Sequence, residues 1–195
     1  MTHAIDRERA TAIVTRTLDD AIALHQRVRS LDLTAVTTAA SMLSNAVRTG
    51  HKILAFGNGG SAADAQHFVT ELVGRFQKER RGFAAVALTA DTALLTSVAN
   101  DYGFERVFAR QIDALGAPED VACAISTSGR SRNIIAAVEA ARARGLRTIA
   151  LTGRDGGEVG RMVDVHINVP DAVTARVQEV HCTLIHALCE IVEEG

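Results

Sequence analysis

Five short apolar runs alternate with longer segments of helical periodicity, and this alternation constrains the fold more than any other feature. The runs are rich in β-branched residues and fall at residues 52–56, 84–88, 121–125, 148–151 and 165–169. Parallel strands must be joined by crossovers, which are usually helices. The pattern therefore predicts an α/β fold, a three-layer α/β/α sandwich in which helices cover both faces of a five-stranded parallel sheet.

Length and composition are those of one globular domain, which we predict to span residues 1–195. Two amphipathic helical stretches, residues 7–30 and 35–48, precede an α/β core at residues 51–195. The chain is 47% hydrophobic with two prolines, so neither a disordered linker nor a low-complexity segment is expected.

Charge and hydropathy exclude several partners. A formal charge of −2 without a basic stripe argues against nucleic acid binding. Residues 1–10 do not read as a leader, and no run of about 18 apolar residues occurs. We therefore expect a cytoplasmic protein that does not bind membranes. The charged run at residues 78–81 is interpreted as a solvated loop.

The three cysteines are too few and too scattered for a disulfide framework. Cys123 lies inside an apolar run, where a small hydrophobic residue belongs. Cys182 and Cys189 are seven residues apart and share one helix face. All three are predicted to be buried core thiols.

Two loops at strand ends carry the chemistry: residues 57–61, Gly-Asn-Gly-Gly-Ser, and residues 126–131, Ser-Thr-Ser-Gly-Arg-Ser. Backbone N–H groups, hydroxyls and a helix N-terminus together bind a phosphate well. A dinucleotide site is disfavoured for the first loop because the next strand ends without an acidic residue. A simple helix cap would explain one serine of the second loop, but not the other hydroxyls.

His67 and Glu71 are one helical turn apart, so an imidazole and a carboxylate can share one metal ion. Near the C-terminus, Gln178, His181 and His186 gather on one predicted helix. At about 100° per residue, helical geometry alone does not decide which histidine joins His67.

These residues resemble the phosphoheptose isomerase (sedoheptulose 7-phosphate isomerase) family, over nearly the whole chain. The resemblance rests on Gly57-Asn58-Gly59-Gly60-Ser61, Ala65-Gln66-His67-Phe68 with Glu71, Asn100-Asp101-Tyr102-Gly103, Ser126-Thr127-Ser128-Gly129, Leu151-Thr152-Gly153 with Gly156-Gly157, and Gln178-Glu179 through His186.

What the resemblance implies is a sugar isomerase (SIS) domain of the flavodoxin-like, doubly wound type. It implies a homotetramer with active sites at subunit interfaces, in which helices within residues 1–50 pack between subunits. One zinc ion per site would be held by His67, Glu71, Gln178 and His186, so the resemblance selects His186 over His181.

The implied reaction converts sedoheptulose 7-phosphate to D-glycero-D-manno-heptose 7-phosphate through an enediol. Glu71 is the expected base and His186 the expected acid. Two departures from the family pattern, Arg81 and Arg130, leave substrate identity open. Substrate binding is expected at Asn58, Gly59, Gly60, Ser61, Glu71, Asn100, Asp101, Ser126, Thr127, Ser128, Ser131 and Gln178.

An alternative is a non-catalytic SIS-domain protein of the type that associates with the replication initiator DnaA. Such binders resemble the family in both loops but lack the acid and the histidine that match Glu71 and His186. This chain keeps both residues, which favours the enzyme.

Overall fold

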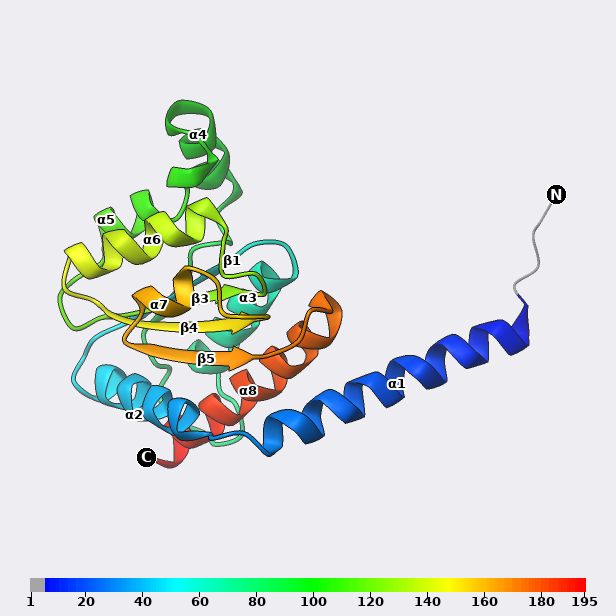
Figure 1. Cartoon of the computed structure of the whole chain (residues 1–195). Helices are drawn as coiled ribbons and strands as arrows, with labels where there is room; N and C mark the ends of the chain where they lie inside the picture. Colours follow the sequence, from blue (N-terminus) through cyan, green and yellow to red (C-terminus); the bar gives the residue numbers. More distant parts are fainter. Residues whose placement is uncertain (1–5) are drawn as a thin grey trace.

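Five parallel strands form the predicted sheet, in the order β2-β1-β3-β4-β5 (Figure 1). The computed structural model describes residues 6–195; residues 1–5 of the predicted domain lie outside the described residues. The strands are β1 (Ile53–Gly57), β2 (Ala85–Ala87), β3 (Val121–Ser126), β4 (Arg147–Gly153) and β5 (Val165–Val169). The predicted α/β/α sandwich is confirmed. β2 is shorter than predicted and lies at the edge of the sheet.

Helices cover both faces of this sheet. One face carries α2 (Thr34–Arg48), α3 (Gly60–Val73) and α8 (Thr174–Glu194). The other carries α4 (Thr92–Tyr102), α5 (Ala109–Leu115), α6 (Arg132–Ala143) and α7 (Val159–Met162), with the short 3-10 helix η1 (Phe104–Arg106) between α4 and α5. Within residues 6–195, no helix combines the length and the apolar content that a membrane crossing requires.

The two hydrophobic cores follow from the alternation of side chains along each strand. In β1, Ile53 and Ala55 pack toward α2, α3 and α8, whereas Leu54 and Phe56 pack toward the opposite helices. All five β1 residues are buried, because a central parallel strand has no solvent-facing side. This explains why the strands appear in the sequence as continuous apolar runs.

The first helix, α1 (Arg7–Arg29), extends away from the rest of the chain (Figure 1). It buries only Leu24 and Val28, near its C-terminal end. Nearer the N-terminus of α1, Arg176 of α8 donates a 2.5 Å hydrogen bond to the carbonyl of Thr17. The large apolar side chains Ile13, Val14, Leu18 and Ile22 of α1 are exposed.

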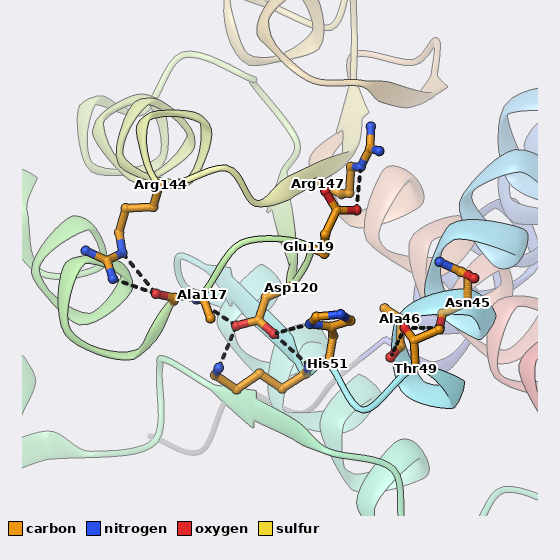
Figure 2. Close-up of polar contacts among 11 residues, drawn as sticks. Asn45, Ala46, Thr49, His51, Ala117, Glu119, Asp120, Arg144 and Arg147 are labelled. Atoms are coloured by element: carbon orange, nitrogen blue, oxygen red, sulfur yellow. Dashed lines mark hydrogen bonds and ion pairs between the residues drawn. The ribbon is translucent and has the colours of Figure 1, made fainter.

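The buried carboxylate of Asp120 connects the segments that precede β1 and β3, at the end of the strands opposite the two loops. Asp120 accepts hydrogen bonds from the backbone N–H of Lys52 (2.9 Å) and of Ala117 (2.8 Å), and His51 lies 3.7 Å away. Figure 2 shows Asp120 pointing between His51 and Ala117. Burial alone would raise the pKa of Asp120, but these hydrogen bonds and the Lys52 ammonium group, which pairs with Asp120 Oδ2, outweigh it and lower the pKa.

Candidate active site

Both predicted loops lie at the carboxyl edge of the sheet, each after one of two neighbouring strands. β1 and β3 pair in parallel with Gly57 opposite Ile125, so the residues that follow emerge side by side. The side chains of Asn58 and Asn133 then exchange two hydrogen bonds, of 2.9 and 2.8 Å. Asn133, which sequence reasoning missed, is buried in the first turn of α6. Its position just after a serine-rich loop is the signal that could have identified it.

The first loop depends on two glycines where α3 begins. Gly59 has a φ of +58°, a left-handed conformation that glycine adopts without strain. A Cβ at Gly60 would collide with the side-chain amide of Gln178. The Gln178 side chain of α8 is therefore packed directly against this loop, in which Ser61 is buried.

The second loop presents its hydroxyls around a tight turn. Ser126 Oγ accepts the N–H of Gly129 at 3.1 Å, and Ser128 Oγ accepts that of Arg130 at 3.3 Å. Ser131 stands at the N-cap of α6 but makes no side-chain capping bond. Among the described residues, its hydroxyl is therefore not used as a helix cap.

A glycine pair closes the back of this second loop. The carbonyl of Gly129 accepts the N–H of Val159 at 3.0 Å, and a Cβ at Gly129 or Gly157 would collide with the facing backbone.

Arg130, one of the two departures from the family pattern, pairs with Asp155 at 2.5 Å on the surface. Such exposed pairs contribute little stability.

The two histidines selected by the resemblance meet between α3 and α8. The Nε2 atoms of His67 and His186 lie 2.7 Å apart, and the rings make an edge contact with 5.0 Å between centroids. Phe76 stacks on the other side of the His186 ring, at 5.5 Å and 27°. These contacts fix the orientation of His186 toward His67.

The other two predicted ligands differ in their placement. Glu71 Oε1 lies 3.7 Å from His67 Nε2, as their one-turn spacing on α3 predicts. Among the described residues, the Gln178 amide makes no hydrogen bond to either imidazole; it lies against Gly60. The site thus gathers His67, His186 and Glu71, with Gln178 packed at the start of α3.

Cys182 corrects a sequence prediction. It is only partly buried, and its Sγ lies 4.0 Å from His186 Nε2, whereas Cys123 and Cys189 are buried in the core as predicted. The helix face that carries Cys182 turns toward the histidine pair because α8 packs against α3. Burial raises the pKa of Cys182, and the carboxylates of Asp64 and Glu71 raise it further.

Packing gives His181 and His186 different surroundings. His181 is fully buried, and its Nε2 donates to the carbonyl of Thr152 at 2.9 Å. Burial lowers the pKa of His181 to about 4, so it is a neutral core residue at pH 7. Glu179, whose role sequence reasoning left open, accepts a 2.5 Å hydrogen bond from Arg176.

Asp64 is a second residue that sequence reasoning missed. One of its carboxylate oxygens is buried without a hydrogen-bond partner among the described residues. Burial raises the pKa of Asp64 to about 6, against the opposing effect of His67. Its position one turn before His67 on α3 is a signal that could have identified it.

The charged run at residues 78–81 is the predicted exposed loop at Lys78, Glu79 and Arg81, but not at Arg80. Arg80 is largely buried; its Nε pairs with Glu193 at 2.9 Å, and its NH2 group donates to the carbonyl of Glu71. Glu193 also accepts the backbone N–H of Phe76, Gln77 and Lys78. The prediction was wrong at Arg80 because Glu193, which neutralises it, lies 113 residues further along the chain.

Asn100 and Asp101, predicted to contact the sugar, lie exposed at the end of α4. Asn100 Nδ2 donates to Asp101 Oδ1 at 2.8 Å. Figure 1 shows α4 standing above the sheet, away from α8. Their contact with a sugar stays a prediction.

Comparison with known proteins shows the family to which the chain belongs. Residues 18–153 match the model of the SIS domain family. The chain is 54% identical to a phosphoheptose isomerase of Geobacter sulfurreducens over 159 residues, 82% of this chain and 84% of that one. It is 49% identical to one of Bordetella avium over 183 residues, 92% and 93% of the two chains.

Solved structures agree as well. The phosphoheptose isomerase GmhA from Neisseria gonorrhoeae superimposes with a TM-score of 0.91 at 45% identity, over 95% of this chain and 100% of that one. A phosphoheptose isomerase from Francisella tularensis gives 0.92 at 36% identity, over 95% and 99% of the two chains. The chain belongs to the SIS domain family and, within it, to the phosphoheptose isomerases, a group of sugar phosphate isomerases.

Proposed function

We propose that this chain interconverts sedoheptulose 7-phosphate and D-glycero-D-manno-heptose 7-phosphate. One observation carries the proposal: two histidines 119 residues apart in sequence lie with their Nε2 atoms 2.7 Å apart, beside the Glu71 carboxylate. The names of the relatives support the choice of a heptose phosphate. The retention of Glu71 and His186 favours an enzyme over the DnaA-associating alternative.

Substrate binding is proposed to begin at the phosphate. The hydroxyls of Ser126, Thr127, Ser128 and Ser131 surround one turn at the N-terminus of α6, where backbone N–H groups favour an anion. Holding the phosphate there would place the opposite end of the sugar at the histidine pair. Binding energy from the remote phosphate is thereby used to orient the reacting carbons.

The proposed chemistry is a proton transfer between C1 and C2. Glu71 removes the proton from the carbon next to the carbonyl and returns it to the neighbouring carbon. His186 donates a proton to the carbonyl oxygen and accepts one from the adjacent hydroxyl, so the protons balance. Phe76, stacked on the ring of His186, holds the imidazole in the orientation that this step needs.

The donor set of the site fits a divalent metal, because imidazole and carboxylate groups converge there. We propose one zinc ion per active site, held by His67, Glu71, Gln178 and His186. When bound, it would polarise the sugar carbonyl and stabilise the charge that develops on the oxygens.

A homotetramer with active sites at subunit interfaces is also proposed. Ile13, Val14, Leu18 and Ile22 of α1 are 46–58% exposed, and the last three recur every four residues along one helix face. An apolar stripe on a projecting helix is suited to packing against other copies of the chain.

The test is to incubate the zinc-loaded protein with sedoheptulose 7-phosphate and to follow an aldose phosphate by NMR. Glu71→Gln should lower kcat by about 10²–10⁴-fold while phosphate binding survives. Glu79→Gln, which changes an 89% exposed carboxylate just beyond α3, is the matched control. Unchanged turnover in Glu71→Gln would remove Glu71 from the mechanism, and no aldose from the wild type would refute the function.

A further inference from the structure

The two loops of the active site leave the sheet toward opposite faces. β1 and β3 are neighbours in the sheet, but α3, which follows β1, packs in one hydrophobic core, and α6, which follows β3, packs in the other. Such a divergence opens a crevice in which ligands bind. The pairing of β1 with β3 ends at Gly57 and Ile125, so contacts beyond this point set the relative position of the two loops.

The side chains of Asn58 and Asn133 bridge this crevice. Each amide donates one hydrogen bond to the oxygen of the other, at 2.9 and 2.8 Å. The amide of an isolated asparagine rotates easily about its last side-chain bond. In this pair, turning over one amide would place oxygen opposite oxygen and nitrogen opposite nitrogen. The pair therefore fixes the plane of both amides and the direction in which their atoms point.

The two asparagines differ in exposure, which gives them different roles. Asn133 is 3% exposed in the first turn of α6, whereas Asn58 is only partly buried. An amide nitrogen carries two N–H groups, and an amide oxygen has two lone pairs. After pairing, Asn58 keeps one N–H and one lone pair for a ligand in the crevice, whereas the burial of Asn133 keeps it away from the ligand.

The backbone at the end of β1 allows this close approach. A Cβ at Gly57 would lie 2.8 Å from the carbonyl oxygen of Ile125 and 2.5 Å from that of Ser61. A side chain at Gly57 would therefore push the ends of β1 and β3 apart. Gly57 brings the two loops together, and the amide pair sets their relative orientation.

We propose that Asn133 is a positioning residue, which holds the Asn58 amide toward the sugar and links the first loop to the phosphate-binding loop. The inference rests on the proposed function, since it concerns the orientation of that sugar phosphate. The second loop anchors the phosphate, while the reacting carbons lie at the other end of the sugar. A shift between the loops misplaces these carbons, and a misplacement of about 1 Å can cost about 100-fold in rate.

The test is a double-mutant cycle in which Asn58 and Asn133 are changed to alanine singly and together. Asn133→Ala should lower kcat/KM for sedoheptulose 7-phosphate about 10- to 100-fold, while the affinity for inorganic phosphate, measured by calorimetry, stays within about twofold. Because Asn133 acts through Asn58, adding Asn133→Ala to Asn58→Ala should lower kcat/KM by less than about threefold more. A merely structural role predicts that the two effects multiply.

Thr148→Val is the matched control. Thr148 is also buried, and its hydroxyl makes two hydrogen bonds to Asp164 at the opposite ends of the strands. The control should lower Tm without changing kcat/KM, and circular dichroism checks that each variant folds. If Asn133→Ala fails to fold, Asn133→Ser, whose side chain is too short to pair with Asn58, takes its place in the cycle.

An Asn133→Ala enzyme with the kcat/KM of the wild type, or effects of the two substitutions that multiply, would overturn the proposal. A wild type that binds sedoheptulose 7-phosphate without isomerising it would reject the proposed function alone, and the same cycle in the dissociation constant would then decide the role of Asn133. A wild type that does not bind this sugar phosphate would reject both.

Discussion

Replacing Glu193 by glutamine tests whether one buried carboxylate holds the loop that supports the active site. The Glu193 side chain is 2% exposed, and it accepts four hydrogen bonds from the segment that follows α3. Oε1 faces the N–H of Phe76 and Nε of Arg80, and Oε2 faces the N–H groups of Gln77 and Lys78. Whichever oxygen is replaced by the NH₂ group of glutamine, two of these N–H donors lose their acceptor and face another donor.

The magnitude follows from these contacts. A buried donor left without its acceptor costs about 1–3 kcal/mol, and removing one partner of a buried ion pair costs about 3–5 kcal/mol. Because the amide retains one acceptor and the loop can relax, we expect about 3 kcal/mol. For a chain of 195 residues, this corresponds to a Tm lower by roughly 6–12 °C.

The pKa of Glu193 predicts how the stability difference between wild type and variant changes with pH. Burial alone would raise the pKa of Glu193, but the hydrogen bonds from Gln77, Lys78 and Phe76 and the charge of Arg80 lower it to about 2. A lowered carboxylate pKa stabilises the fold fully above the unfolded value of about 4.3, and this stabilisation disappears as the pH falls through about 2. The difference between wild type and variant should therefore be constant near neutrality and shrink below about pH 4.

The assay is thermal unfolding followed by circular dichroism, at one protein concentration because assembly shifts Tm. Glu194→Gln is the matched control, since Glu194 is the next residue and its pair with Lys78 is exposed. Its effect should stay within about 0.5 kcal/mol. A Glu193→Gln variant as stable as this control, or a difference that grows on acidification, would refute the reasoning.

Three further results are expected. Ser128→Ala should raise KM by about tenfold or more with little change in kcat, because one hydroxyl is lost from a phosphate site; an unchanged KM would contradict the phosphate assignment. His186→Ala should lower bound zinc more than His181→Ala, which should instead lower Tm; metal analysis by mass spectrometry would reveal the reverse order. Leu18→Lys should reduce the molecular mass in sedimentation, and an unaltered mass would exclude this part of α1 from the subunit interface.

The fold was predictable because its signals are local. Every strand was placed within about two residues of its observed bounds, since the apolar runs of a parallel sheet are short, continuous and separated by helical periodicity. The two loops were found for a similar reason. Glycine and serine at the end of a strand indicate a turn and a group of hydroxyls, and this pattern can be recognised from the loop residues alone.

The site was predictable only in part. The pair of His67 and Glu71 follows from one helical turn, but helical geometry did not decide between His181 and His186, which face different neighbours. Cys182 and Arg80 were misinterpreted because their environments depend on α3 and α8 packing together.

The sequence by itself determined the strands, the helices and the chemical character of both loops, because each depends on residues within a few turns of one another. Only the tertiary structure decided which side chains meet. His67 reaches His186 and Cys182, and Arg80 reaches Glu193, because the sheet aligns two helices more than 100 residues apart in the chain. Such contacts depend on the packing of whole elements, and a local pattern does not specify that packing.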